Sequence, residues 1–300
     1  MAGYTPHQRL DNLLEADLLK EAVDKLYAKA GKSIEEQAQG ISVSGQTVLN
    51  IVRRFNPEKI ELKEEPLIKR EARIIYIEAD EDHVAHREKG VNAFDQRLIY
   101  VHEGRVQVGK DRYELIGKKY FTFPPGTKPE TIWSNIYDFL DATYDLEKTE
   151  HIFISGDGVP WIKAGATYIY GAKYVLDGYH LRRAVFKAAG ADDDTREALF
   201  KAIFSGKRGE MNRLLTALKE EANSESRKGA ILDVQKYLNN QWPGILAMRR
   251  YRNLLVGCSA EGHVIHVLSA RMSSRPMGWS YLGANQMAHL RVNRENGANP

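Results

Sequence analysis

The sequence predicts an α/β protein with a helical insertion between its later strands, preceded by a small all-helical region. Three observations lead to this fold class. Apolar residues recur at helical spacing up to about residue 55, and short apolar runs typical of strands begin at Arg73. The block from Gly178 to about Met248 has a pattern typical of helices with charged faces, and no strand run. We therefore expect an α/β domain over residues 73–300, with the insertion at about 190–250.

Composition narrows the class further. The 300 residues are 43% hydrophobic and 28% charged, with 24 glycines and 10 prolines, which excludes disordered, collagen-like and coiled-coil proteins. A single cysteine, Cys258, excludes an internal disulfide and a cysteine-rich zinc site. No apolar run is long enough to span a bilayer, and the N-terminal residues do not form a secretion signal. We expect a cytoplasmic protein with no membrane partner.

Charge is distributed unevenly along the chain. The net charge of +3 is too small to indicate a nucleic-acid partner by itself. Residues 171–253 nevertheless hold 16 lysines and arginines against 10 acidic residues, which leaves the remainder of the chain acidic. A basic middle segment is the asymmetry that a function has to explain.

The first 57 residues are expected to be helical. An apolar pattern from Leu10 to Leu26 predicts one helix that ends at Gly31. Ser33, with Glu36 three residues later, predicts the start of a short second helix that Gly40 closes.

A further helix is expected to start at Ser44, and two short helices joined by a tight turn resemble a helix-turn-helix. Its outward face would contact DNA through polar and basic side chains: Gln46, Thr47, Asn50 and Arg53. The alternative is a small helical bundle whose outer face is only solvated. Asn56-Pro57 and the charged run after it predict a linker over residues 58–72.

The strands and helices of the later domain follow in order. Strands are predicted at the apolar runs Ile74–Ile77, Leu98–Val101, Arg105–Val108, Ile152–Ile154, Tyr174–Leu176 and Leu254–Val256. Glu103-Gly104 is expected to be the turn of a hairpin between the second and third of these runs. Helices are expected around Ile132–Leu140 and Asn285–Val292.

Two aspartates follow apolar strands directly. Asp80 and Asp157 each stand where a buried run stops, and open α/β sheets present ligands there. Glu261 follows the last predicted strand, on a helix that Ser259 could cap. Carboxylates that converge repel one another unless a cation lies between them, and oxygen ligands suit Mg²⁺ or Mn²⁺. Asp82, two residues beyond Asp80 on the same strand face, is the rival for the first position.

Four sequence blocks in order carry a family resemblance. They are IEADEDHV (77–84), ISGDGVPWIK (154–163), VLDGYHL (175–181) and GCSAEGHVIHVLSARMSSRPMGWS (257–280). Together they resemble the successive signatures of the ISLre-type insertion-sequence transposases of bacteria, which are similar to Mutator-type transposases. The resemblance covers the chain from about Ser33 to its end.

The resemblance implies a ribonuclease-H-like mixed sheet with a DDE triad formed by Asp80, Asp157 and Glu261. It implies a transposase that binds DNA, both the element ends and the target, as a homo-oligomer associated with the nucleoid. The triad would hold two Mg²⁺ (or Mn²⁺) ions that serve cleavage and joining of phosphodiester bonds. Asp177-Gly178-Tyr179-His180 resembles the Asp/Cys-x-x-His signature of Mutator-like relatives, which gives His180 a supporting catalytic role; the alternative is a capping aspartate and a packed histidine.

Family members are generally longer ahead of the helix-turn-helix. One alternative is therefore a truncated or domesticated remnant that occupies DNA without mobilising it. Another alternative is a metal-dependent nuclease of the same fold.

Several further residues are candidates for binding the DNA backbone: Lys173, Arg182, Arg183, His263 and Arg275. For the basic residues after the Asp177 signature the alternative is a solvated helix face. His263 and His266 with Cys258 could instead form a transition-metal site, although a lone cysteine beside glycine is usually a buried apolar residue. Trp161 could stack on a splayed base or pack in the core.

Overall fold

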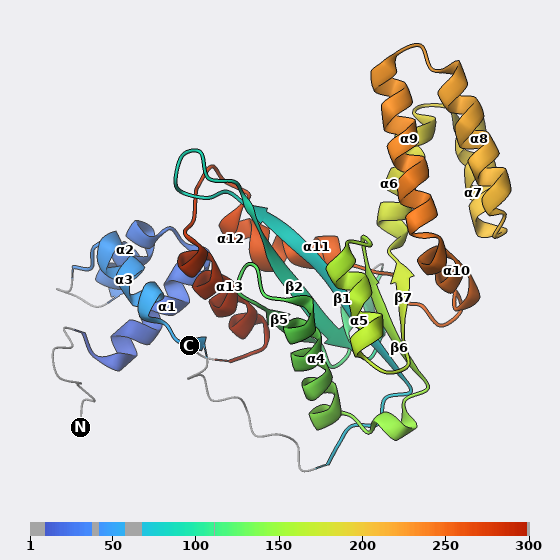
Figure 1. Cartoon of the computed structure of the whole chain (residues 1–300). Coiled ribbons are helices and arrows are strands. Elements are labelled where there is room, and N and C mark those ends of the chain that lie inside the picture. Colours follow the sequence, from blue (N-terminus) through green and yellow to red (C-terminus); the bar gives the residue numbers. More distant parts are fainter. Residues whose placement is uncertain (1–9, 38–41, 58–67, 111, 299–300) are drawn as a thin grey trace.

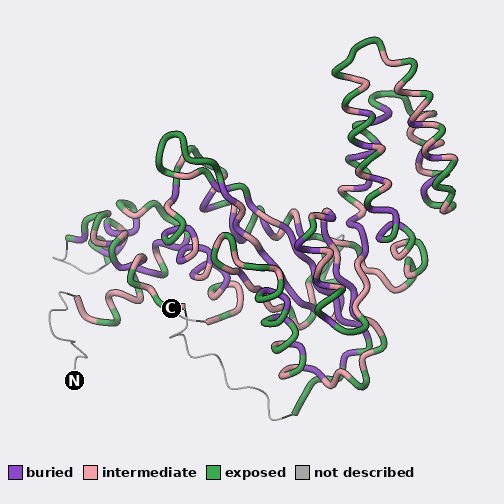
Figure 2. The backbone as a smooth tube through the Cα atoms, in the orientation of Figure 1, coloured by how far each residue is buried: buried purple, intermediate pink, exposed green. Residues whose placement is uncertain are grey.

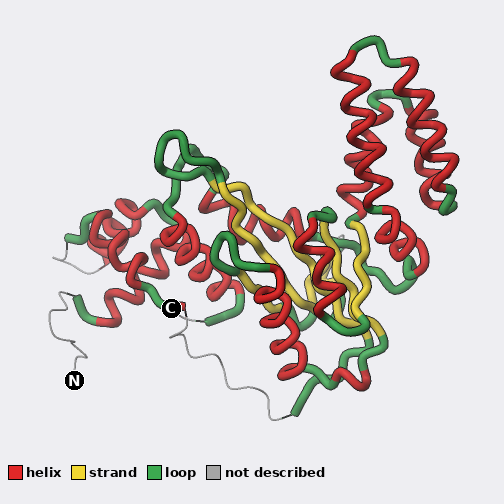
Figure 3. Tube along the Cα trace, in the orientation of Figure 1, coloured by secondary structure: helices red, strands yellow, loops and turns green. Residues whose placement is uncertain are grey.

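A five-stranded mixed sheet lies at the centre of the molecule, with helices on both faces (Figures 1 and 3). The computed structural model describes residues 10–37, 42–57, 68–110 and 112–298. The sheet has the order β5-β2-β1-β6-β7, in which β1 runs antiparallel to β2 and parallel to β6. The strands are β1 (Ile74–Val84), β2 (Phe94–His102), β5 (Lys119–Thr122), β6 (His151–Gly156) and β7 (Ala172–Leu176). This sheet confirms the α/β class.

The central strand β1 is longer than its apolar run predicts. It continues through the acidic residues to Val84, so Asp80 lies inside the strand, paired with Leu98 of β2, and not at its end. The prediction that the strand stops before Asp80 was wrong, because an apolar run marks only the part of a strand whose side chains are buried among apolar groups. The strand is instead held by backbone pairing with β2, and its carboxylates alternate onto one face.

Two helices cover one face of the sheet. They are α4 (Pro129–Thr143) and α5 (Pro160–Tyr168). Trp133 of α4 is fully buried, stacks on Trp161 of α5 and donates its Nε1–H to the Trp161 carbonyl at 2.7 Å. Both helices pack on alternate residues of the central strands, including Ile75, Ile77 and Ile154. Trp161 is 6% exposed, so the structure favours its role as a core residue.

The C-terminal helices and the N-terminal helices share the core on the opposite face. The helices are α1 (Asn12–Asp24), α2 (Tyr27–Gln37), α3 (Gly45–Arg54), α11 (Ala260–Val264), α12 (Ala270–Met272) and α13 (Tyr281–Glu295), with a π-helical turn at Ile265–Ser269. Their apolar residues form one cluster with Val84, Leu98 and Tyr100 of the sheet. Arg291 of α13 donates to the Val23 carbonyl at 2.8 Å and ties α1 to this layer.

The N-terminal helices differ from the prediction at Gly31. The first helix ends at Asp24, and α2 runs through both Gly31 and Ser33, so neither residue marks a helix boundary. A Cβ at Gly31 would lie 2.1 Å from the Val43 carbonyl oxygen. Gly31 therefore serves close packing of the chain and does not terminate the helix. Ser44 does cap α3 as predicted, accepting from the Thr47 N–H at 3.1 Å. Gly40 and linker residues 58–67 lie outside the described residues.

The predicted hairpin at Glu103-Gly104 is not formed. The strand after it, β3 (Arg105–Gly109), pairs with β4 (Arg112–Leu115) in a separate two-stranded sheet, and β2 pairs with β1 and β5. The residues of β3 are all exposed, whereas those at the end of β2 are buried. Local turn signals show where a strand ends but not which strand it pairs with.

The basic middle of the chain forms a helical arm, as the sequence predicted (Figure 1). Its helices are α6 (Gly178–Ala189), α7 (Asp193–Phe204), α8 (Arg208–Glu221), α9 (Glu225–Asn240) and α10 (Trp242–Arg250). They have an apolar core of their own that includes Leu199, Leu215 and Leu238. Figure 2 shows that much of the arm is exposed, whereas the strands of the sheet are buried.

No strand forms at Leu254–Val256, contrary to the prediction. The Leu254 carbonyl accepts a hydrogen bond from the Tyr76 hydroxyl, and the segment packs its apolar side chains on Tyr76 and Phe153 without joining the sheet. An apolar run alone does not distinguish a strand from an irregular segment that packs over one. The C-terminal helix is confirmed as α13. Within the described residues no helix has the length and apolar character that crossing a bilayer requires.

The close approach at Gly31 gives a stability prediction. Gly31→Ala is expected to lower the free energy of unfolding by about 1 to 3 kcal/mol, because the added methyl group must displace the Val43 backbone. Gly229→Ala in α9 is the matched control, since nothing lies within 4 Å of its Cβ position, and it is expected to be neutral or stabilising. Urea denaturation of both variants measures the difference; equal stabilities would contradict the packing role of Gly31.

Candidate functional site

Strand register brings the two predicted aspartates together. The parallel pairing of β1 with β6 runs to Glu78 and Ser155, so Asp80 and Asp157 both follow it at the same end of the two strands, and the charge of Asp157 acts on Asp80. The next register match, Gly156 with Leu176, puts Asp177 beside Asp157, and the Asp177 N–H donates to the Gly156 carbonyl at 3.0 Å. Three aspartates therefore share one edge of the site.

Two helices add the remaining groups. Asp177 caps α6 by accepting from the Tyr179 N–H at 3.0 Å, and the first turn of that helix carries His180. The His180 Nε2 lies 3.8 Å from an Asp177 carboxylate oxygen and 3.9 Å from Glu261 Oε2. Glu261 is in the first turn of α11, which packs against β1. Ser259 precedes α11 but makes no side-chain cap, which corrects the prediction.

Asp80, His180 and Glu261 each offer a ligand atom, and these atoms all lie within 4.8 Å of one another. Asp80 is 7% exposed, and the Glu261 side chain is 44% exposed and open to solvent. Asp157 is not in this set: its Oδ1 accepts from the Val159 N–H at 3.0 Å, although its charge acts on Asp80. The donor set fits a divalent cation, with oxygens that suit Mg²⁺ or Mn²⁺ and one imidazole nitrogen that suits Mn²⁺ better than Mg²⁺.

Asp80 is the residue of the site whose pKa is most affected by its surroundings. Burial, followed by the negative charges of Asp157 and Glu261, raises the pKa of Asp80 to about 7, although the Glu81 N–H donates to its Oδ1 at 2.9 Å. A buried carboxylate that faces other carboxylates is a group whose charge a cation would stabilise. The raised pKa follows from the same geometry that makes a metal site possible.

The rival residue Asp82 is occupied differently. It projects from the same face of β1, but the hydroxyls of Ser269 and Ser273 donate to its Oδ1 at 2.9 and 2.6 Å. Burial raises the pKa of Asp82, and those hydroxyls oppose the shift. Asp82 thereby fastens the helical layer to the sheet, and it is not among the groups clustered with Glu261. The geometry supports Asp80 over Asp82 for the first ligand position.

Glu78 is the residue that sequence reasoning missed. It is 2% exposed and accepts hydrogen bonds from the Tyr100 hydroxyl, from His102 Nε2 at 3.0 Å and from the Ser259 N–H at 2.6 Å. Despite burial, these donors lower the pKa of Glu78, so it stays charged. Its contact with Ser259 fixes the chain two residues before Glu261. The available signal was an acidic residue inside the IEADED alternation of a buried strand.

Basic side chains approach the site from the helical arm. A hollow of about 360 Å³ is lined by Asp157 and His180 together with Arg183, Lys187 and Tyr237. The Tyr237 hydroxyl donates to the Asp157 carbonyl at 2.7 Å, so α9 is fastened to the loop that carries this aspartate. Arg182 lines a neighbouring hollow of about 260 Å³ with Asp177. Two predicted DNA-binding residues, Arg182 and Arg183, thus lie next to the acidic groups.

The other predicted DNA-binding residues are dispersed. Lys173 lies over the Tyr251 ring, with its Nζ 5.6 Å from the ring centroid, and Arg275 is exposed between α12 and α13. His263 bonds through Nδ1 to the Tyr120 hydroxyl at 2.6 Å, and burial lowers its pKa to about 4. A neutral His263 brings no charge to a DNA phosphate. Its role as a DNA contact stays a prediction.

The helix-turn-helix candidates lie on α3, far along the molecule from the acidic site (Figure 1). Gln46 and Asn50 are exposed and bond to one another, with the Gln46 Nε2 donating to the Asn50 Oδ1 at 3.0 Å. The Thr47 hydroxyl lies 2.9 Å from the Ser44 hydroxyl at the helix cap. Arg53, at the last turn, lines a cavity against the C-terminal helices. The structure does not bring these residues to Asp80, Asp157 or Glu261.

A second set of close ligand atoms belongs to Glu81, His83 and Asp95. His83 and Asp95 are exposed and bond directly to each other, and Glu81 accepts from the Trp161 Nε1–H at 2.9 Å. These contacts already satisfy the groups, so the set resembles an ordinary solvated cluster.

Comparison with known proteins identifies the family. The chain belongs to the family described as "Uncharacterised protein family (UPF0236)", which it matches over residues 2–300. Two similar proteins of Caldanaerobacter subterraneus subsp. tengcongensis, UPF0236 protein TTE0610/TTE0881/TTE1053/TTE2432 and one whose name joins eleven locus designations, are each 37% identical over 97% of this chain and 60% of their own length. The "UPF0236 protein in vanSb 3'region" of Streptococcus gallolyticus is 27% identical over 92% of this chain and 62% of its own. The chain thus spans about three fifths of the length of these relatives.

The raised pKa of Asp80 predicts a pH-dependent stability. A carboxyl group whose pKa is higher in the folded state than in the unfolded state costs stability as pH rises from about 4 to about 7. In protein freed of metal by chelation, Asp80→Asn is therefore expected to be more stable than wild type at about pH 8, by on the order of 1 to 4 kcal/mol, and nearly equal at about pH 4.

Urea denaturation at both pH values measures this difference. Asp138→Asn, a change of an exposed aspartate on α4, is the matched control and should show no such pH-dependent gain. A difference between Asp80→Asn and wild type that does not change with pH would contradict the proposed strain at Asp80.

Proposed function

We propose that this UPF0236 protein is a DNA transposase that cleaves and joins phosphodiester bonds with Mg²⁺ or Mn²⁺, on a ribonuclease-H-like domain. The observation that carries the proposal is the meeting of Asp80, His180 and Glu261, with Asp157 just beyond the paired part of β1 and β6. Asp80 and Glu261 come from distant parts of the chain, and both belong to blocks that resemble transposase signatures. The mixed sheet with helices on both faces is compatible with the implied fold.

The family comparisons add support of a different kind. A relative's name that joins eleven locus designations of one genome is consistent with a gene present in many copies, as a mobile element would be. Because the chain spans about three fifths of its relatives, the activity proposed is that of the domain described here.

The residues present define the chemistry that the site would support. Asp80, Asp157 and Glu261 would hold the divalent cations, which supply activation of the attacking oxygen and charge stabilisation at phosphorus. Arg183 and Lys187 line the same hollow and would bind the DNA backbone as sequence-independent charge. His180, whose Nε2 lies near both Asp177 and Glu261, would complete the ligand set with its ring nitrogen.

Two displacements at phosphorus would then follow in sequence. Water attacks the phosphodiester at the element end and leaves a 3′ hydroxyl, and that hydroxyl attacks target DNA. Each step exchanges one phosphorus–oxygen bond for another, so neither a covalent protein intermediate nor an external energy source is needed. Action on two element ends suggests a homo-oligomer on DNA, located with the nucleoid.

Metal binding gives the first test. Mg²⁺ or Mn²⁺ at about 100 times its dissociation constant is expected to raise the free energy of unfolding of the wild type by about 2.7 kcal/mol. Asp80→Asn and Glu261→Gln should lose most of this gain, because each removes a ligand oxygen that its neighbours cannot replace. Urea denaturation with and without metal measures the effect. Equal stabilisation of wild type and variants would place the metal elsewhere.

Strand cleavage gives the second test. The full chain is incubated with labelled element-end DNA, with and without Mg²⁺, and products are separated on denaturing gels. Replacing Asp80, Asp157 or Glu261 by Ala is expected to lower cleavage about 100-fold or more, while DNA binding stays within a few-fold of wild type. Asp138→Ala, which alters only an exposed acid, is the matched control and should cleave normally.

Products of the cleavage assay also separate the alternatives. Joined products support a transposase, and cut but unjoined DNA supports a nuclease of the same fold. Bound DNA that is never cut supports a remnant that only occupies DNA. A variant at any of the three acids that cuts at the wild-type rate removes that residue from the site.

A further inference from the structure

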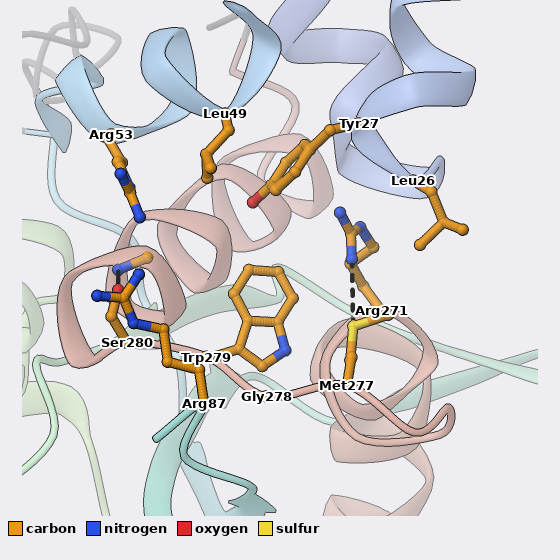
Figure 4. Close-up of a pocket in the computed structure, with 11 residues that line it drawn as sticks. Leu26, Tyr27, Leu49, Arg53, Arg87, Arg271, Met277, Gly278, Trp279 and Ser280 are labelled. Carbon is orange, nitrogen blue, oxygen red and sulfur yellow. Dashed lines mark hydrogen bonds between the residues drawn. The ribbon is translucent and has the colours of Figure 1, made fainter. Parts of the chain in front are cut away.

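A cavity of about 280 Å³ lies between the N-terminal helices and the C-terminal helices, apart from the acidic site (Figure 4). Its walls come from α3, the start of α2, α12 and the segment that leads into α13. Three arginines line it: Arg53, Arg87 and Arg271. The described lining residues include no aspartate or glutamate, so the cavity is positively charged.

Arg271 is a buried charge without a carboxylate partner. It is 6% exposed, and its guanidinium carbon lies 5.1 Å from the ring centroids of both Tyr27 and Trp279. Its Nε donates to the Ala22 carbonyl at 3.2 Å, and its Nη1 to the Met277 sulfur at 3.6 Å. Among the described residues no carboxylate lies within 4.0 Å of it. A guanidinium has five N–H donors, and burying a charge unpaired is costly, so this position is prepared for an anion.

Tyr27 adds a second unsatisfied group. Its ring lines the cavity, and its hydroxyl oxygen is shielded from water and has no hydrogen-bond partner in the described part of the chain. A buried hydroxyl without a partner costs free energy that a ligand oxygen could recover. Among the described residues the cavity thus holds a guanidinium without a carboxylate partner and a hydroxyl without a hydrogen-bond partner.

Arg53 and Arg87 come together at the end of the cavity where Ser280 lies (Figure 4). Arg87 has only a loose contact with Glu88 at 4.0 Å, and no carboxylate of the described chain pairs with Arg53. Ser280 is also the N-cap of the 15-residue helix α13, whose first amide groups favour negative charge. Two cations without a close carboxylate and a helix N-terminus therefore favour an anionic group at this end.

The remaining wall of the cavity is apolar, and it limits which other groups a ligand can carry. Leu26, Leu49 and Met277 line the cavity alongside the Trp279 ring, so a bare inorganic anion would leave this surface unused. The volume lies just below the roughly 300 to 1,000 Å³ of pockets for drug-sized ligands, which suits one small unit. A phosphate ester that carries a planar or apolar group matches both walls. A nucleotide has this chemistry, and in a concave cavity it must be unpaired, because a paired base stays stacked within the duplex.

We propose that this cavity binds a single unpaired nucleotide of a DNA strand, with its phosphate held by Arg53 and Arg87 and its remainder between Arg271, Trp279 and the apolar wall. The choice of DNA as the source rests on the proposed function. The site also joins α3, the predicted DNA-reading helix, to the C-terminal layer that carries Glu261. DNA bound here would hold the two parts of the protein on the same strand.

Binding of two DNA duplexes by the full chain tests the proposal. One labelled duplex is fully paired, the other has the same sequence with one unpaired nucleotide, and both are titrated by fluorescence anisotropy in chelator without metal. Wild type is expected to bind the second duplex about tenfold more tightly, since charge-assisted hydrogen bonds of this kind are worth about one such factor. Equal affinities for the two duplexes would overturn the proposal.

Variants locate the effect in the cavity. Arg53→Ala with Arg87→Ala and, separately, Leu49→Glu should bring the affinity ratio of the two duplexes close to one. Tyr27→Phe removes only the unpartnered hydroxyl, keeps the packing, and should lower the ratio about two- to threefold. Arg112→Ala, which removes an exposed arginine of β4 outside the cavity, is the matched control and should keep the wild-type ratio. An unchanged ratio in all cavity variants would overturn the proposal.

Free deoxynucleoside monophosphate and inorganic phosphate distinguish the source of the ligand. The monophosphate could raise the melting temperature of wild type but not of the variant with Arg53→Ala and Arg87→Ala, while the affinities for the two duplexes are equal. In that case the ligand is a free nucleotide, and the DNA proposal fails. The ratio should persist in Asp80→Asn. If the affinity ratio of the two duplexes depends on the cavity but no metal-dependent cleavage occurs, the proposed function fails and nucleotide binding stands. If metal-dependent cleavage occurs but the affinity ratio is one, nucleotide binding fails and the proposed function stands.

Discussion

The arrangement of the molecule depends on three carboxylates that project from one face of the central strand. Glu78, Asp80 and Asp82 are all nearly inaccessible to water, and they differ in the hydrogen bonds that offset the cost of burying a carboxylate. Glu78 is charged and bound by a tyrosine, a histidine and a backbone amide. Asp82 is held by two serine hydroxyls. Asp80 has a single backbone donor and faces other acids, so its pKa rises to about 7. The carboxylate with the fewest hydrogen-bond donors of the three is therefore the one at the candidate site, and its neighbours fasten the surrounding helices.

Those two structural carboxylates explain how residues so distant in sequence meet. Glu78 binds the Ser259 amide just ahead of α11, and Asp82 binds Ser269 and Ser273 just after it. The short helix that carries Glu261 is thus anchored to β1 on both sides, with Asp80 between the anchors. On the other side of the site, Asp157 and Asp177 directly follow the parallel strands β6 and β7. The positions of the acidic groups are thus set by the sheet and by the hydrogen bonds that fasten α11 to β1. The helical arm adds basic groups around them.

The elements that local chemistry specifies were predictable from sequence. Ser44 caps α3, the apolar period produces α4 and α13, and the apolar runs at 152–154 and 174–176 are strands. Three predictions that depended on partners farther along the chain were wrong. Gly31 meets Val43 and does not end a helix, the segment after Gly104 pairs with β4 and not with β2, and Leu254–Val256 packs without a strand partner. In each of these cases, the local sequence pattern identified a residue or segment with a structural role but did not show what it would contact.

The sequence by itself determined the α/β class and the helical arm, because caps and periods are local features, and its resemblance to transposase signatures gave Asp80, Asp157, His180 and Glu261 as candidates. Tertiary structure alone decided that Asp80 and not Asp82 lies with Glu261, that Glu78 anchors the segment before α11, and that Arg53 and Arg271 line one cavity. Those outcomes depend on contacts between residues that are far apart in the chain. Solvation by such neighbours, and not residue type, sets whether a buried charge is satisfied or left available for a ligand.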